Sequence, residues 1–314
     1  MRGWWVWGLV LWVGGCQGHA TPPQAQEKVI LTTFTVLADM TRNVAGAQVR
    51  VESLTKPGVE IHGYEPTPMD MVRAQNAHLL LENGLGLERW AERFYSHLRG
   101  VPRVTVSQGI TPIPLRAGAY QNQPNPHAWL SPKLALIYVE NIRQALVKLD
   151  PGKAAIYTQN ARKYQQKIQA LDQKLQQSLS VIPPSQRVLV SCEGAFSYLA
   201  RDYQLKEIYL WPINAEQQGT PQQIRRAIDQ VRASKVPVVF CESTVKDQVQ
   251  RQVAKEANVR FGGIFYVDSL TPPGGAAPTY LHLLEHNINT LIQGLHNPVH
   301  SRSESHASNP KYCG

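Results

Sequence analysis

Apolar residues recur at alternating spacings of three and four between residues 151 and 181. This spacing keeps them on one stripe of a helix, so it predicts a long helix with one buried face and one solvated face. Asp150 and Pro151 suit the N-cap and the first helical position, and Pro183 with Pro184 prevents continuation. At a rise of about 1.5 Å per residue the helix spans about 45 Å, which predicts a strut between two lobes. A coiled-coil arm is the alternative, but a zipper needs a denser Leu and Ile stripe than Tyr157, Ala161, Tyr164, Ile168, Leu171, Leu175 and Leu179.

Short apolar, β-branched runs alternate with amphipathic segments on both sides of this helix. Before it, the pattern predicts strands at 29–34, 49–54, 78–82 and 101–106 and helices at 36–44, 69–76 and 133–149. After it, the pattern predicts strands at 187–191, 207–210, 236–240 and 262–267. It predicts helices at 220–233 and 279–294, and another that follows Glu242 and runs to about residue 257. Such alternation is typical of parallel sheets flanked by helices, so we expect an α/β fold with two half-chains of similar design.

The two ends of the chain differ from this pattern. Residues 1–15 hold one Arg followed by a Trp-, Val- and Leu-rich run too short to span a bilayer, which predicts a signal peptide. The run ends at Cys16 after small residues, as in the lipobox of bacterial lipoproteins, so we expect lipidation of Cys16 and a flexible tether at 16–28. An uncleaved anchor with an incidental Cys is the alternative. Residues 297–314 are polar, and we expect a disordered tail.

Composition narrows the class of protein. With 314 residues, 43% of them hydrophobic and 18% charged, the chain suits a soluble protein of two domains. The formal charge is +9, but Lys and Arg are scattered without a dense basic run, which argues against nucleic-acid binding. We interpret the charge as a general property of the surface, one that favours an anionic membrane.

Four polar residues follow predicted strands, where ligands bind in open α/β sheets. Glu193 and Asp268 end strands of the second half, while His62 and His127 lie in loops that follow strands of the first half. Two imidazoles and two carboxylates make a plausible metal set. A single loop His is more often a surface or capping residue, so placement alone does not decide between these roles.

A family resemblance is more specific than the placement of these residues. From about Val29 to Leu295 the chain resembles the metal-binding solute receptors of bacterial ABC importers, of the manganese and zinc type. The stretches that carry the resemblance are HGYEPTP at 62–68, NGLGLE at 83–88, NPHAWLSP at 125–132, EGAFSY at 193–198, EQQGTP at 216–221, ESTV at 242–245 and YVDSL at 266–270.

The resemblance implies two pseudo-symmetric lobes, 29–150 and 183–296, joined by one rigid helix at 151–182. It implies that Mn²⁺, Zn²⁺ or Fe²⁺ is held between the lobes by His62, His127, Glu193 and Asp268. A monomer lipid-anchored in the cell envelope would deliver the ion to an ABC permease and its ATPase subunit, without chemical turnover. A metallohydrolase and an adhesin are the alternatives, but the chain lacks an H-E-x-x-H motif and an adhesin leaves the ligand set unexplained.

Glu193 favours manganese within this family, because zinc receptors usually have a third His at the matching position. Carboxylate oxygens suit the harder Mn²⁺, although affinity order alone never excludes zinc. The loop 111–126 holds no His or acidic residue, unlike the His-rich loop of many zinc receptors. Asn125 stands where the family often has Asp, which we expect to weaken a contact to His127. Since both His must be neutral to bind metal, binding is expected to fall as the pH drops through about 6.5.

The remaining candidates have structural interpretations. Cys192 and Cys241 end two strands of one lobe, which predicts a disulfide in an oxidising compartment; free thiols or zinc ligands are the alternatives. Cys313 has no evident partner. His282 and His286 are spaced i, i+4 near the end of the last helix, where a surface or capping role is expected. Glu65 and Glu242 are expected to support turns and neighbouring groups rather than to bind metal.

Overall fold

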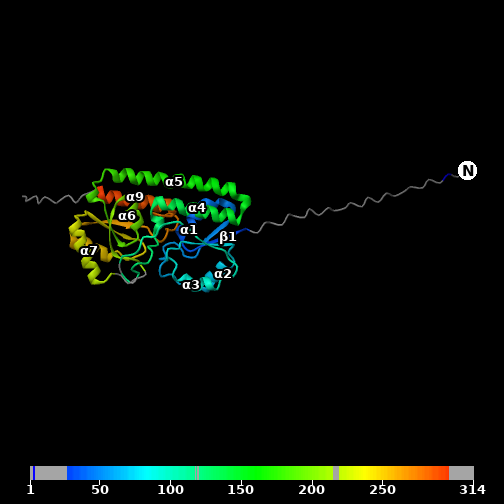
Figure 1. The fold of residues 1–314 in the computed structure, drawn as a ribbon, viewed down its shortest axis with the longest axis horizontal. Coiled ribbons are helices and arrows are strands. Elements are labelled where there is room, and N and C mark those ends of the chain that lie inside the picture. The colour runs from blue at the N-terminus through cyan, green and yellow to red at the C-terminus, as the bar shows by residue number, and fades with distance from the viewer. Residues whose placement is uncertain (1–2, 4–26, 117, 119, 215–218, 297–314) are drawn as a thin grey trace, which may run out of the picture.

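The computed structural model describes residue 3 and residues 27–116, 118, 120–214 and 219–296. Two α/β lobes lie side by side, and the long helix α5 (Ala154–Ser180) runs over both of them (Figure 1). Within each lobe the strands pair in parallel. This architecture confirms the predicted fold class.

The first lobe contains one four-stranded parallel sheet in the order β2-β1-β3-β4. Ile30 of the central strand pairs with Val51 on one side and with Leu79 on the other. The strands are short and apolar because both faces of a parallel sheet are covered by helices. The elements are β1 (Val29–Thr32), α1 (Thr35–Ala45), η1 (Gly46–Gln48), β2 (Arg50–Ser53), α2 (Pro68–Gln75), β3 (Leu79–Glu82), α3 (Ala91–Ser96), β4 (Arg103–Thr105), η2 (Ala128–Leu130) and α4 (Pro132–Leu149).

The second lobe contains two parallel ribbons, β5-β6 and β7-β8, in place of one ladder. A disulfide joins β5 to β7, with a Cα to Cα distance of 4.9 Å between Cys192 and Cys241. The ribbons therefore lie side by side at the strand ends that carry Glu193 and Glu242. The elements are η4 (Pro184–Gln186), β5 (Val188–Glu193), α6 (Ser197–Tyr203), β6 (Lys206–Trp211), α7 (Pro221–Ser234), β7 (Val238–Glu242), α8 (Gln248–Ala257), β8 (Arg260–Phe265) and α9 (Tyr280–His296).

Helix α5 buries the stripe that the sequence predicts. Six of the seven stripe residues are buried, and Leu171 is partly buried against the same core. Helical structure begins at Pro151 with Asp150 at the N-cap position, as predicted, but its first turn is a 3-10 turn, η3 (Pro151–Lys153), and the Asp150 side chain makes no cap hydrogen bond. Asp150 instead pairs with Lys28 at 3.3 Å, which fastens the start of β1 to the end of α4.

Side-chain caps fix the starts of two other helices. Thr67 and Asp70 form a reciprocal capping box at α2, and Thr220 and Gln223 form one at α7. The short helices α3 and α6 had no predicted counterpart, because six or seven residues are too few to establish a helical period.

One continuous apolar core extends through both lobes beneath α4, α5 and α9. It includes Phe34 and Trp129 from the first lobe and Phe240 and Phe265 from the second. Each lobe has a further, separate cluster on the outer face of its strands. The lobes therefore share packed side chains as well as a connecting helix, and a shared core limits how freely they move.

Several sequence expectations fall outside the described part of the chain. These are the signal peptide at 1–15, Cys16 with most of the tether at 16–28, part of the stretch 216–221, and the tail at 297–314 with Cys313. Among the described residues, no helix combines the length and the apolar character needed to cross a membrane.

Candidate metal centre

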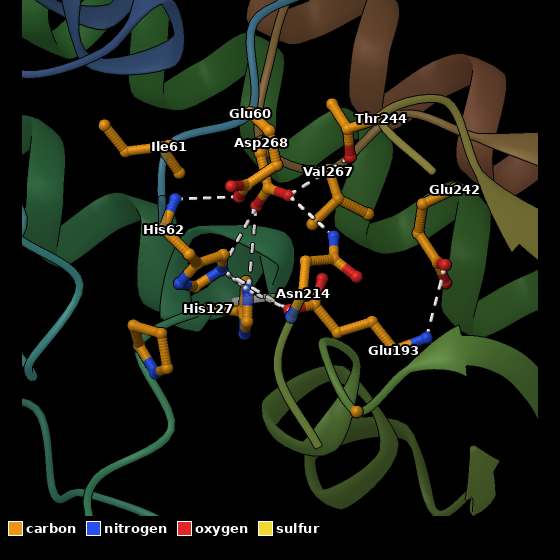
Figure 2. Close-up of polar contacts among 12 residues, drawn as sticks. Glu60, Ile61, His62, His127, Glu193, Asn214, Glu242, Thr244, Val267 and Asp268 are labelled. Carbon is orange, nitrogen blue, oxygen red and sulfur yellow. Dashed lines mark hydrogen bonds and ion pairs between the residues drawn. The ribbon is translucent and has the colours of Figure 1, made fainter. Parts of the chain in front are cut away.

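Four side chains from four separate segments meet between the lobes (Figure 2). His62 lies in the loop between β2 and α2, and His127 lies immediately before η2. Glu193 is the last residue of β5, and Asp268 follows the end of β8. The sequence predicted that all four residues follow strands, and the structure brings their side chains together.

The ligand-type atoms of these residues lie within 4.8 Å of one another. The two Nε2 atoms of His62 and His127 are 3.0 Å apart. Glu193 Oε1 lies 3.4 and 3.5 Å from them, and Asp268 Oδ1 lies 3.8 and 3.6 Å away. At metal to ligand distances of about 2.1 Å, two nitrogens this close subtend roughly 90° at a shared ion. The cluster can thus surround one metal ion after small adjustments.

Burial controls the protonation of this cluster. His62 is 8% exposed, and His127, Glu193 and Asp268 are 0% exposed. Burial lowers the pKa of His62 and lowers that of His127 to about 3, so both imidazoles are neutral near pH 7. Burial raises the pKa of Glu193 well above its usual value, with the Asp268 and Glu242 charges adding to the effect. Burial also raises the pKa of Asp268, although His62 opposes the rise.

Three buried carboxylate oxygens in and beside the cluster lack protein donors. Among the described residues, Glu193 Oε2, Asp268 Oδ1 and Glu242 Oε1 are buried without a hydrogen-bond partner. An unpaired buried acceptor costs about 1–3 kcal/mol and a buried unpaired charge costs more. A bound cation removes that cost for the two carboxylates that face the histidines, so the donor set fits a divalent metal.

Asn125 orients His127. Its Oδ1 lies 2.8 Å from His127 Nδ1 and accepts the His127 backbone N–H at 3.1 Å. With Nδ1 carrying the proton, the Nε2 lone pair faces the other ligand-type atoms. Asn125 thus keeps the contact to His127, and the expectation that the contact is weaker than one made by Asp stays a prediction. On the other histidine, Glu60 Oε1 accepts the backbone N–H of His62 at 2.7 Å.

Asn214 supports both carboxylates. Its backbone N–H donates to Glu193 Oε1 at 2.8 Å, and its Nδ2 donates to Asp268 Oδ2 at 3.3 Å. Thr244 Oγ1 also donates to Asp268 Oδ2 at 3.3 Å. Asp268 therefore has one oxygen held by donors and one oxygen facing the histidines.

The second lobe fixes the backbone beside Glu193. The Glu193 N–H donates to Glu242 Oε2 at 3.2 Å, and the neighbouring residues Cys192 and Cys241 are bonded with an S–S distance of 2.00 Å. The structure thus joins the two thiols that the sequence paired, rather than leaving them as thiols or zinc ligands. Glu242 supports the Glu193 backbone, in line with its expected role.

Sequence reasoning missed Asn214 and the contact of Thr244. Asn214 follows the end of β6, so the strand-end rule that found the other residues applies to it too. Asn is common in loops, however, and its hydrogen bonds to two carboxylates depend on lobe packing that no local pattern encodes.

A hollow of about 430 Å³ lies next to Asp268. Its lining includes Asn214 and Thr244, which donate to Asp268, together with Glu60 and Lys246. None of the four proposed ligands is among its lining residues, so the hollow lies beside the cluster rather than within it.

The two histidines of α9 lie in its first half rather than near its C-terminus, and both have structural partners. His282 Nδ1 lies 2.7 Å from Thr279 Oγ1, and His286 Nε2 lies 2.9 Å from the Ile264 carbonyl oxygen. Glu65 is exposed at the loop that leads to α2.

Comparison with known families tests the resemblance. Residues 30–294 match the family described as "ZnuA: Zinc-uptake complex component A periplasmic". The chain belongs to the ZnuA family. The match covers both lobes and the helix between them.

Individual ZnuA-family relatives differ in the metals they are named for. The chain is 54% identical to the iron-binding protein YfeA of Yersinia pestis over 270 residues, which is 86% of this chain and 87% of that protein. It is 35% identical to the manganese-binding lipoprotein MntA of Halalkalibacterium halodurans over 281 residues, 90% of this chain and 93% of that one. A solved structure of a Mn-bound periplasmic metal-binding protein from Candidatus Liberibacter asiaticus superposes with a TM-score of 0.81 at 42% identity, covering 86% of this chain and 100% of that chain.

Proposed function

We propose that this chain is the extracytoplasmic receptor of an ABC importer, which captures a divalent transition metal ion between its lobes and delivers it to a membrane permease. The observation that carries the proposal is the convergence of four buried ligand-type side chains from both lobes, His62, His127, Glu193 and Asp268. Because both lobes supply ligands, binding the ion favours the closed arrangement of the lobes. A permease that pulls the lobes apart would divide the ligand set and release the ion.

We propose Mn²⁺ as the cargo, with Zn²⁺ and Fe²⁺ as competitors. Two carboxylates beside two imidazoles suit a harder ion than a site with three imidazoles does. Glu193 Oε2 has no protein donor, so this carboxylate can supply a second oxygen and raise the coordination number above four. The names of MntA and of the Mn-bound structure support manganese, while the name of YfeA supports iron as the first competitor.

Binding without turnover is the better match for the geometry. A hydrolytic metal site keeps an open coordination position with a base beside it. Here the four side chains enclose the site, and the exposed fraction is 8% for His62 and 0% for the other three. A buried site of this kind suits an ion as the whole ligand.

We further propose that the protein acts in the cell envelope, anchored by a lipid on Cys16, as the word lipoprotein in the name of MntA supports. The partners would be a permease and its ATPase subunit. We propose a single chain as the working unit, since the site is built from one chain.

Metal analysis with competition tests the proposal. Protein purified without added metal is analysed by mass spectrometry of its metal content, then stripped and titrated with Mn²⁺, Fe²⁺ and Zn²⁺ separately and in pairs. We expect one ion per chain, displaced only by another transition metal, with loss of binding in Asp268→Ala. Binding of less than one ion by the native chain, or undiminished binding by Asp268→Ala, would reject the proposed site.

A further inference from the structure

Asn125 contacts both lobes through the two ends of one amide. Its Oδ1 accepts from His127, while its Nδ2 donates to the Gly194 carbonyl oxygen at 2.6 Å and to Ser197 Oγ at 3.2 Å. Asn125 is 1% exposed, so these bonds lie away from competing water. Gly194 directly follows Glu193. The Asn125 side chain thus links His127 of the first lobe to Gly194 of the second lobe, the residue after Glu193.

The contacts fix the orientation of this amide. One end faces a backbone N–H and the imidazole nitrogen of His127, so it must be the oxygen. The other end faces the carbonyl oxygen of Gly194, so it must be the nitrogen. A flipped amide would set its oxygen against the Gly194 oxygen, and both favourable sets of bonds would be lost.

The surrounding contacts form a seam between the lobes. Tyr198 Oη donates to the Asn125 carbonyl oxygen at 2.7 Å and accepts the N–H of Ile113 at 3.2 Å. Ser197 Oγ donates in turn to Glu207 Oε2 at 2.6 Å. The seam therefore joins the loop before His127 to the turn between β5 and α6, and Asn125 alone among these residues also touches a proposed metal ligand.

A carboxylate at position 125 would act differently. Asp would keep the acceptor for His127 but would present an oxygen to Gly194, where the present distance is 2.6 Å. Two acceptors at that distance repel each other, so an Asp would separate the two lobes at this point rather than join them.

We propose that Asn125 is a positioning residue that holds His127 and the Glu193 segment in the closed arrangement before metal arrives, and so slows release of the ion. This inference rests on the proposed function, since it assigns a role to the seam in retaining the cargo. The closed arrangement is then stabilised by the amide as well as by the ion. Release to a permease requires this bond to break together with the metal bonds.

The test compares Asn125→Asp and Asn125→Ala with the native chain. Small-angle scattering of the metal-free proteins measures compactness, and stopped-flow mixing of Mn²⁺-loaded protein with excess chelator measures the dissociation rate. We expect both variants to be more expanded than the native chain when metal-free, and to lose Mn²⁺ about tenfold faster, the effect of removing one buried hydrogen bond. Asn125→Asp keeps the acceptor for His127, so its faster loss would point to the bond across the lobes.

Asn141→Asp is the matched control. Asn141 Nδ2 also donates to backbone carbonyl oxygens, those of Val106 and Gln108, but within one lobe. We expect it to leave both compactness and dissociation rate unchanged. If metal-free Asn125→Asp scatters as the native chain does, the proposal is overturned, whatever the rate. If the native chain binds no metal, the proposed function fails, while the metal-free scattering still decides the role of Asn125.

Discussion

The backbone N–H of Leu270 donates to Thr35 Oγ1 at 2.9 Å, although 235 residues separate the two in the chain. Leu270 lies two residues after Asp268, and on the other side of Asp268 the Val267 carbonyl oxygen accepts from Trp129 Nε1 at 3.1 Å. Thr35 and Trp129 belong to the first lobe. The segment that carries Asp268 is therefore fastened to the first lobe on both sides, even though it leaves a strand of the second. Opening the lobes would place strain on this segment.

Thr35→Val is expected to weaken metal binding without touching the cluster. Valine keeps the shape but removes the acceptor, which leaves the buried N–H of Leu270 unpaired at a cost of about 1–3 kcal/mol of folding free energy. The Asp268 segment becomes less well fixed, so we expect affinity to fall about tenfold. Chemical denaturation and calorimetric titration measure the two effects.

Thr41→Val on the same helix α1 is the control. Thr41 Oγ1 donates to the Leu37 carbonyl oxygen within the helix, so its loss leaves no group near Asp268 unpaired. We expect unchanged metal affinity. Equal weakening by Thr41→Val and Thr35→Val would mean that the effect reflects general destabilisation rather than the position of Asp268.

The disulfide is expected to stabilise both the lobe and the metal site. Cys192 and Cys241 are 49 residues apart, and replacing both by Ala should lower the free energy of unfolding by about 2–4 kcal/mol. Because Cys192 adjoins Glu193, and Cys241 adjoins the Glu242 that accepts the Glu193 N–H, metal affinity should fall as well.

Peptide mapping without reductant tests the covalent bond, and denaturation with metal titration tests its consequences. Free thiols at Cys192 and Cys241 in oxidised native protein would contradict the pairing. Full metal affinity in the double Ala variant would mean that the disulfide does not contribute to the metal site.

Metal binding near pH 7 is expected to release protons from carboxyl groups rather than from imidazoles. Burial lowers the pKa of His62 and His127, so both are neutral already, whereas it raises the pKa of Glu193 and Asp268. The pKa of Glu193 is raised well above its usual value, so the metal-free site holds a proton on Glu193 that the ion must displace, and affinity rises with pH. The sequence predicted that metal binding is lost as the imidazoles become protonated near their usual pKa. The lowered imidazole pKa values instead assign the pH dependence near pH 7 to carboxyl groups.

Calorimetry in buffers of different ionisation enthalpy counts the protons released. Glu193→Gln should release fewer protons than the native chain at the same pH, because the carboxyl whose pKa is raised well above its usual value is gone. An equal count in the two proteins would assign the released protons to other groups.

The sequence was sufficient for features set by local pattern. The stripe of α5 follows from a spacing that any helix imposes, and Glu193 and Asp268 were found because parallel strands direct their ends to one edge. The position of Asp150 before the helical stretch was predicted, but its side-chain bond was not: Asp150 pairs with Lys28 from a distant segment and makes no side-chain cap. An ion pair between distant segments is not encoded in the local pattern.

Features that depend on lobe packing could not be predicted. The bonds of Asn214 to both carboxylates, and the bond of Asn125 to Gly194, join segments that are far apart in sequence. The residue type of Asn125 suggested a weakened contact, but its amide has a donor that aspartate lacks. Its role is therefore visible only once the second lobe is in place.

The proposed lipid anchor on Cys16 is expected to be separable from metal binding. Cys16→Ser removes the thiol that a lipid would modify, so the protein should move from the membrane fraction to the soluble fraction. Because residue 16 precedes both lobes, metal content should be unchanged. Fractionation followed by metal analysis is the measurement, and a Ser variant that still sediments with membranes after processing would reject lipidation at Cys16.

Glu193→His is expected to shift preference from Mn²⁺ towards Zn²⁺. The change replaces an anionic oxygen donor, and the free Oε2 beside it, with one neutral nitrogen. The site loses a charge and the capacity for a higher coordination number, which zinc tolerates better than manganese. We expect the Mn²⁺ to Zn²⁺ affinity ratio to fall at least about tenfold, whereas Asp268→Ala should weaken both metals by at least that factor. Calorimetric titration of each variant with each metal gives these ratios.

Glu242→Gln is the matched control for this prediction. Glu242 is as buried as Glu193 and accepts the Glu193 N–H, but its carboxyl is not among the atoms that surround the proposed ion. Gln keeps an acceptor for that N–H and removes a buried carboxyl whose pKa burial raises well above its usual value, so it should leave the affinity ratio unchanged while absolute affinities shift together. If Glu193→His left the ratio unchanged, Glu193 would not be a ligand and the manganese assignment would lose its main support. If Glu242→Gln shifted the ratio as far as Glu193→His did, the total charge of the site rather than the donor atom at residue 193 would set the preference.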